Sequence, residues 1–266
     1  MNVCEIARGD GPVILAFPHV GTGLPPGVAA RLNDEGLLLR DTDWHIDRLY
    51  ADLIPGLTTI TATQSRYVID LNRDPAGNSL YPGQTTTGLI PETTFDDVPI
   101  WRAGHGPQPA DIAHWLDQVH RPYHAALAAE IARVRARHGV AVLYDCHSIR
   151  SRIPWLFPGV LPDLNIGTDG GTTCAPELET AVAEIARDSG HSWVLNGRFR
   201  GGWTTRHYGR PQDGVHAIQM ELAQISHLAA EEPPFATDPD KAAHLRLTLT
   251  KIVSALAEIA PGLARR

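Results

Sequence analysis

The sequence has few cysteines, no excess of positive charge and no long apolar run, and each absence excludes a class of protein. Its 3 cysteines in 266 residues form no CxxC pair, which argues against a disulfide framework or a thiolate zinc site and favours a reducing compartment. The 23 basic residues against 30 acidic ones give no electrostatic footprint for nucleic acid. No stretch resembles a signal peptide or reaches the roughly 18 apolar residues of a membrane span. We therefore expect a soluble, cytoplasmic protein that binds neither nucleic acid nor a membrane.

Alternating strand and helix patterns indicate an α/β protein with layers around one sheet. The runs VILAFP and VAVLYDC are almost continuously apolar, which is typical of strands covered on both faces. Strands are predicted at 13–18, 57–63, 65–71, 140–146, 192–196 and 215–222, and helices at 41–54, 109–138, 177–189 and 238–259.

Three long segments without periodicity follow predicted strands, at 72–107, 148–176 and 197–214. They are rich in Gly, Pro, Thr and Trp. Long loops in a compact protein are usually functional. The sequence shows no repeat and no clear linker, so we expect a single domain over residues 1–266.

Two histidines stand where apolar strands end, the position at which open α/β sheets build their sites. His19 follows the strand at 13–18, and Gly21 and Gly23 allow a tight turn after it. His147 belongs to LYDCHSI at 143–149. A histidine that merely satisfies a turn is about as common as a ligand in such a place. In an extended strand Cys146 and His147 point apart, so a cysteine nucleophile with His147 as its base is disfavoured, and Cys146 is interpreted as a small buried residue.

Carboxylates and an arginine lie in the other polar motifs. In DTDWHIDRLYADL at 41–53, Asp43 and Asp47 are four residues apart and would share a helix face, with Asp41 or Thr42 as the N-cap. A solvated acidic first turn is the simpler interpretation of that motif alone. In SRYVIDLNRDP at 65–75, strand alternation would place Arg66 beside Asp70 as an ion pair. That pair could be structural, or it could orient the guanidinium for a ligand.

These residues suggest a two-histidine, one-carboxylate metal site with a nearby base. His19, His147 and an acid from 41–53 would leave a coordination position open, and Glu221, at the end of the strand at 215–222, would act as the base. The short zinc signature HExxH is absent. Such a site can also hold Fe(II), Mn or Co.

Seven motifs in register resemble the N-formylglutamate amidohydrolases. They are VILAFPHVG, DTDWHIDRLY, SRYVIDLNRDP, LYPGQTTTGLIPETTFDDVPIW, LYDCHSI, RGGWTTRHYG and HAIQMELAQ, which run from about residue 13 to 226. The resemblance implies a three-layer α/β/α fold with a mixed central sheet, distantly similar to aspartoacylases and zinc carboxypeptidases. It also implies zinc-dependent hydrolysis of N-formyl-L-glutamate to L-glutamate and formate, in histidine degradation.

The resemblance assigns roles residue by residue. His19 and His147 resemble zinc ligands, Glu221 the general base and Arg66 the arginine that stabilises the oxyanion. Carboxypeptidase-like relatives place a glutamate three residues after the first histidine, where this chain has Thr22, so we expect Asp43 as the third ligand, with Asp47 as the alternative.

The substrate contacts follow from the same resemblance. The pair Asn72 and Arg73 resembles the asparagine–arginine pair that binds a substrate carboxylate in the family. Glutamate carries two carboxylates, and Arg206 is a candidate for the second, although a structural role is equally consistent with its motif. Another N-formyl or N-acyl amino acid, formiminoglutamate, or a non-catalytic anion-binding role on the same fold remain alternatives. The sequence does not indicate an oligomeric state.

Overall fold

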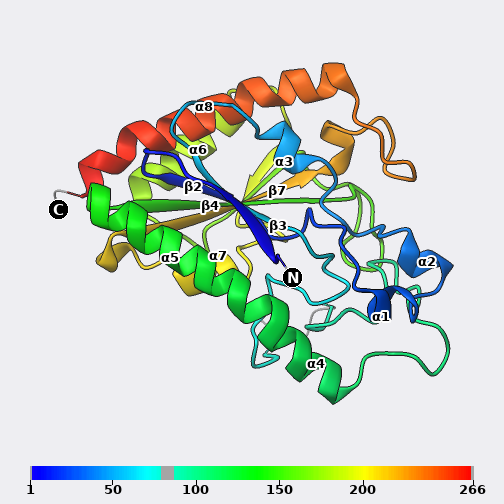
Figure 1. Cartoon of the computed structure of the whole chain (residues 1–266). Helices are drawn as coiled ribbons and strands as arrows, with labels where there is room; N and C mark the ends of the chain where they lie inside the picture. The colour runs from blue at the N-terminus through cyan, green and yellow to red at the C-terminus, as the bar shows by residue number, and fades with distance from the viewer. Residues whose placement is uncertain (1, 79–86, 265–266) are drawn as a thin grey trace.

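The computed structural model describes residues 2–78 and 87–264, and within them seven strands form one sheet (Figure 1). The strands across the sheet are β1 (Cys4–Ala7), β3 (Thr58–Ala62), β2 (Val13–Phe17), β4 (Ala141–Ile149), β7 (Val215–Ala223), β5 (Leu164–Gly167) and β6 (Trp193–Leu195).

The sheet is mixed. Strands β3, β2, β4 and β7 run parallel to one another, and β6 is parallel to β5. Strand β1 is antiparallel to β3, and β5 is antiparallel to β7. Because β2, β4 and β7 are parallel, their carboxyl ends meet at one edge of the sheet, which is where α/β proteins place their sites.

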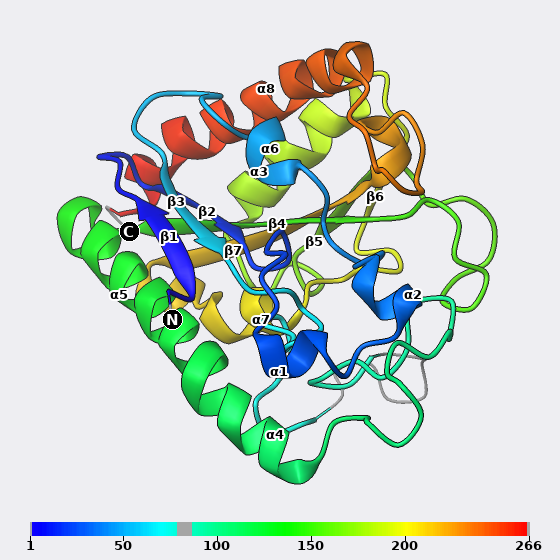
Figure 2. The same ribbon diagram turned by 45° about the vertical axis from the view of Figure 1, so that its right-hand side comes forward.

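Helices cover both faces of the sheet (Figures 1 and 2). Helix α5 lies on one face, and α6 and α8 lie on the other. The three-layer α/β/α prediction is therefore confirmed. The helices are α1 (Pro26–Ala29), α2 (Asp34–Leu37), α3 (Ile46–Leu49), α4 (Pro109–Trp115), α5 (Arg121–His138), α6 (Pro176–Arg187), α7 (Trp203–Tyr208) and α8 (Pro239–Leu263), with a π-helical turn η1 (Leu116–His120) and 3-10 turns η2 (Pro211–Asp213) and η3 (Gln224–Ser226).

Alternation along the central strands divides the core into two layers. Val13, Leu15 and Phe17 of β2 pack toward α6 and α8, while Ile14 and Ala16 pack toward α5. Each of these side chains is at most 2% exposed, and burying an aliphatic or aromatic side chain of this size contributes about 1.5–3 kcal/mol. The apolar runs therefore do mark strands that are covered on both faces.

The long helices begin and end at the residues that favour such boundaries. Pro109, Pro176 and Pro239 occupy first helical positions, where the missing N–H costs no hydrogen bond. The Asp238 carboxylate caps α8 by accepting from two backbone N–H groups. Helix α5 ends at Gly139, whose φ of 73° lies in the left-handed region that glycine tolerates.

Segment 65–71 is not a strand, so that prediction is wrong. It forms a turn in which Val68 N–H donates to the Ser65 carbonyl over 2.9 Å, and Asp70 N–H then donates to the Leu89 carbonyl over 2.8 Å. Both faces of the segment are buried. Its apolar residues therefore reflect burial rather than strand pairing.

The helix predicted at 41–54 is reduced to the short α3. His45 adopts a φ of 62°, outside the right-handed helical region, and separates residues 41–44 from that helix. Asp41 and Thr42 are therefore not its N-cap, and Asp43 does not share a helix face with Asp47. Strand β1 was not predicted, and the segments predicted as loops contain β5 and α7. In the described ranges, no helix is both long and apolar enough to cross a membrane.

Candidate active site

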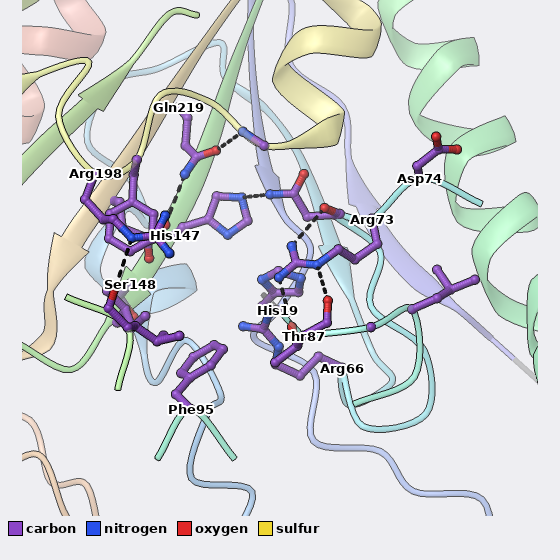
Figure 3. A pocket seen from close by; sticks show the side chains of 18 of the residues that line it. His19, Arg66, Arg73, Asp74, Thr87, Phe95, His147, Ser148, Arg198 and Gln219 are labelled. Carbon is purple, nitrogen blue, oxygen red and sulfur yellow. Dashed lines mark hydrogen bonds between the residues drawn. The ribbon is translucent and has the colours of Figure 1, made fainter. Parts of the chain in front are cut away.

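The polar side chains that follow the central strands converge on one pocket (Figure 3). His19 lies two residues beyond β2, His147 lies in β4, and Glu221 lies in β7. Gly21 permits this arrangement by close approach rather than by an unusual φ, since a Cβ there would lie 2.4 Å from the Gln64 carbonyl oxygen. All three predicted loops contribute to the lining, and residues 79–86 of the first lie outside the described part.

His19, Asp43 and His147 form a buried cluster that could hold a metal ion, with one ligand atom from each within 4.8 Å of the others. Asp43 Oδ2 lies 3.1 Å from His147 Nδ1 and 3.7 Å from His19 Nδ1. The three side chains are at most 3% exposed. Asp47, the alternative ligand, lies in α3 and is not part of the cluster.

Each histidine of the cluster turns its other nitrogen toward a second carboxylate. His19 Nε2 lies 2.7 Å from Asp70 Oδ1, and His147 Nε2 lies 3.2 Å from Asp145 Oδ1. Metal-bound histidines commonly have such carboxylate partners, which fix the ring and make the free nitrogen a better ligand. The donor set therefore fits a divalent cation.

The carboxylates in and around the cluster favour positive charge at this place. Burial alone would raise the pKa of Asp43, but the neighbouring His147 and His19 outweigh it and lower that pKa. Burial alone would lower the pKa of His147, but Asp145 and Asp43 raise it well above its usual value. The same carboxylates would favour a bound metal ion.

Arg66 is held rigidly beside the cluster. Its Nη2 donates to Asp70 Oδ2 over 2.7 Å, and its guanidinium lies 4.8 Å from the centre of the Phe95 ring. Burial works against its charge, but Asp70, Asp43 and Asp41 raise the pKa of Arg66. The predicted ion pair with Asp70 is present, although a turn rather than a strand creates it. A fixed, desolvated guanidinium suits the stabilisation of a developing negative charge.

Glu221 faces the same pocket from β7. Its Oε2 accepts a 3.0 Å hydrogen bond from Gln219 Nε2, and Gln219 Oε1 accepts from Gly202 N–H over 2.6 Å. Burial raises the pKa of Glu221 to about 8, against the opposing effects of His147 and Arg66.

Asn72 and Arg73 line the pocket on the side of α7. Asn72 Oδ1 accepts from Thr204 N–H over 2.9 Å, and its Nδ2 lies 3.1 Å from His147 Nε2. Arg73 donates to the Thr87 carbonyl and hydroxyl over 3.1 and 2.9 Å. Arg73 Nη1 also lies 3.7 Å from Asp70.

Arg206 is not among the described residues that line the pocket, in contrast to its predicted place there. It donates to the Gly201 carbonyl over 2.8 Å and lies 3.3 Å from Asp169. Arg198, which no sequence motif indicated, does line the pocket, opposite Arg73 (Figure 3). Its motif carries no spacing signal, because it sits in the irregular segment between β6 and α7.

Cys146 lies away from this chemistry. It is fully buried in the layer formed with α6 and α8, and burial raises the pKa of its thiol well above its usual value. A protonated thiol is a poor nucleophile.

A mixed α/β sheet with a His–Asp–His cluster, a buried glutamate and an arginine at its carboxyl edge is the arrangement expected of a metal-assisted hydrolase. Comparison with known proteins identifies the family. The model of the N-formylglutamate amidohydrolase family matches residues 11–227. The chain therefore belongs to this family.

Individual relatives agree with that assignment. The chain is 45% identical to an N-formylglutamate deformylase of Pseudomonas aeruginosa and 43% identical to one of Pseudomonas putida, in both cases over 96% of each chain. A crystal structure of N-formylglutamate amidohydrolase from Ralstonia eutropha JMP134 superimposes with a TM-score of 0.79 and 27% identity, over 96% of this chain and 97% of that one.

Proposed function

We propose that this protein is a metal-dependent amidohydrolase that converts N-formyl-L-glutamate and water to L-glutamate and formate. The observation that supports it best is that His19, His147, Glu221 and Arg66 line one pocket, with Asp43 in the same buried cluster as the two histidines. The substrate is proposed from the names of the two Pseudomonas relatives, to which the chain is 45% and 43% identical.

His19, Asp43 and His147 would hold the metal, and Asp70 and Asp145 would orient the two rings. Zinc fits this ligand set, because neutral histidines and a carboxylate are its usual catalytic ligands. When bound, such an ion acidifies water and polarises a carbonyl. The chain supplies the remaining steps.

Glu221 would take a proton from the attacking water as the oxygen of that water bonds to the formyl carbon. Arg66 would donate hydrogen bonds to the carbonyl oxygen as it gains negative charge. Glu221 would then pass the proton to the leaving nitrogen, the C–N bond would break, and formate and the glutamate amine would be released. Gln219 would keep the Glu221 carboxylate in place through its 3.0 Å hydrogen bond.

Substrate recognition is assigned to two walls of the pocket. Asn72 and Arg73 would bind one carboxylate of the substrate, as the family resemblance implies. Arg198, on the opposite wall, would bind the other and so replaces Arg206 in that role (Figure 3). Arginine suits both positions because its planar fork can contact two carboxylate oxygens. A place in histidine degradation and a cytoplasmic location are part of the same proposal.

The test is formate release from N-formyl-L-glutamate by purified protein, with and without a chelator and after zinc is restored. We expect activity that the chelator removes and zinc returns, and that alkylation of thiols leaves unchanged. N-formylaspartate, N-acetylglutamate and formiminoglutamate, measured in parallel, decide the substrate. A metal-loaded, folded sample that releases no formate would overturn the proposed substrate, and chelator-resistant turnover would overturn the metal assignment.

A further inference from the structure

Two buried histidines contact the backbone on either side of Asn72. His120 ends the π-helical turn η1, and His124 lies four residues later in α5, so both rings project from the same side. Their ring centres are 4.4 Å apart. Single π-helical turns inside helices occur frequently at functional sites. We call this pair the His120–His124 clamp.

The clamp binds the two carbonyl groups that flank Asn72. His124 Nε2 lies 2.8 Å from the Leu71 carbonyl oxygen, and His120 Nε2 lies 3.1 Å from the Arg73 carbonyl oxygen. A carbonyl can only accept, so each Nε2 carries a hydrogen and donates it. The segment 71–73 is thereby fixed at both ends by hydrogen bonds from one helix.

Both rings are buried and held by aromatic neighbours. His120 is 1% exposed and His124 is 8% exposed. Trp203 packs against both, with ring centres 5.7 and 4.8 Å away, and the Tyr208 hydroxyl lies 3.1 Å from His124 Nδ1. Burial lowers the pKa of both histidines, so they remain neutral donors.

The other side of the same segment faces the pocket. The Asn72 side chain reaches His147 and the backbone of Thr204, and Arg73 lines the pocket beside it. A shift of the carbonyls at 71 or 73 would therefore move both groups to which substrate binding is assigned. Neither ring is among the described residues that line the pocket.

We propose that His120 and His124 are positioning residues that hold Asn72 and Arg73 in the geometry that binds a substrate carboxylate. This inference rests on the proposed function. The competing view is that the two rings only fill space between α5 and α7. The positioning role requires a hydrogen-bond donor at the Nε2 position. A packing role requires only a side chain of similar volume.

Substitutions at each position can separate the effect of the hydrogen-bond donor from the effect of side-chain volume. Glutamine places an N–H near the position of Nε2, whereas asparagine is polar but too short, and leucine fills space without donating. The set is H120Q, H120N and H120L with H124Q, H124N and H124L. The matched control is H114Q, because His114 is an exposed histidine on α4 of the same helical segment.

The measurements are kcat and KM for N-formyl-L-glutamate, the inhibition constant of L-glutamate, bound metal and the thermal midpoint. For the asparagine and leucine variants we expect KM and the glutamate inhibition constant to rise about fivefold to tenfold, as the loss of one hydrogen bond predicts. Bound metal should be unchanged, and glutamine should restore most of the binding. H114Q should match the wild type.

Each outcome decides the matter. Folded leucine or asparagine variants with unchanged KM and inhibition constant would overturn the clamp, as would glutamine variants that fall as far as asparagine. If the leucine variants do not fold, the comparison of asparagine with glutamine decides. A wild-type protein that releases no formate would overturn the proposed function instead, and glutamate binding by calorimetry would still test the clamp.

Discussion

His147 on β4 and Glu221 on β7 occupy directly opposite positions on two neighbouring parallel strands. Both side chains line the pocket. Their neighbours Cys146 and Met220 pack together in the layer toward α6 and α8, so His147 and Glu221 share the other face of the sheet. The separation of the proposed metal ligand and the proposed base is therefore set by strand register. A slip of one residue would turn one of the two side chains to the other face.

The substitution E221Q should abolish most turnover. It keeps the size of the side chain and its contact with Gln219 but removes the proton acceptor, so kcat should fall by about 10²–10⁴-fold. Bound metal, measured by elemental analysis, should not change. E92Q, at an exposed position, is the control. Near-normal turnover by E221Q would end the assignment of the base.

The third metal ligand can be tested by comparing D43N with D47N. Asp43 lies in the buried cluster and Asp47 does not. D43N should therefore weaken metal binding by more than about tenfold, since even the loss of a residue that only orients a ligand can cost that much, and activity should fall with it. D47N should bind metal as the wild type does. The reverse result, in a metal titration followed by calorimetry, would make Asp47 the ligand.

The role of Arg198 predicts a change in substrate preference. R198Q should lower kcat/KM for N-formyl-L-glutamate by about tenfold to a hundredfold, the usual effect of losing a hydrogen bond to a charged group. It should have much less effect on N-formylmethionine, which has no second carboxylate. R206Q is the control and should retain the preference of the wild type. An equal loss of kcat/KM with both substrates would show that Arg198 does not bind the side-chain carboxylate of the substrate.

Gly202 should not tolerate even alanine. A Cβ there would lie 2.3 Å from Asn72 Nδ2, so G202A must displace a side chain that contacts both His147 and α7. We expect kcat/KM to fall by at least about tenfold, because small displacements of positioning groups are costly. G262A is the control, since a Cβ at that position meets nothing within 4 Å. Steady-state kinetics on both variants provide the measurement.

His227 should make the fold sensitive to acid. Burial lowers its pKa to about 4, while Nε2 lies 3.0 Å from the Trp44 carbonyl oxygen. In the unfolded chain His227 takes up a proton near pH 6.5, whereas in the folded chain it does not. Its contribution to the free energy of unfolding is therefore fully present above pH 6.5 and is lost as the pH falls toward 4. The loss is on the order of 3 kcal/mol.

The control for this prediction is H227Q, which can retain the hydrogen bond but cannot titrate. Its free energy of unfolding in urea should depend less steeply on pH between 6.5 and 4 than that of the wild type. Identical slopes for the two proteins would assign the acid sensitivity to other groups.

The parts of the fold that sequence could predict are those decided by local pattern. Strands β2 and β4 could be predicted from their continuous apolar runs, and the long helices from their helical pattern of apolar residues. The segment 65–71 could not be recognised as a turn, because a buried turn can carry the same aromatic and β-branched residues as a strand, here Tyr67, Val68 and Ile69. At α3, His45 adopts a left-handed conformation and its Nε2 lies 3.0 Å from the Phe235 carbonyl oxygen. A contact between residues so far apart in the chain leaves no local pattern in the sequence.

The site shows the same division. His19, His147 and Glu221 could be placed because strand ends are visible in the sequence. The choice between Asp43 and Asp47 could not be made, because it depends on where an irregular segment folds back in space. No local pattern marked Arg198, and Arg206 is not among the described residues that line the pocket. The path of the chain before and through α7 depends on distant contacts with Asn72 and Gln219.

Asp70 contacts three groups of the proposed site at once. One fully buried carboxylate accepts from the Arg66 guanidinium and the Asn72 backbone, and it lies 2.7 Å from His19 Nε2. Three groups with different assigned tasks thus share one point of attachment. A displacement of the Asp70 carboxylate would therefore shift all three groups at once, and a substitution there would disturb all three tasks together.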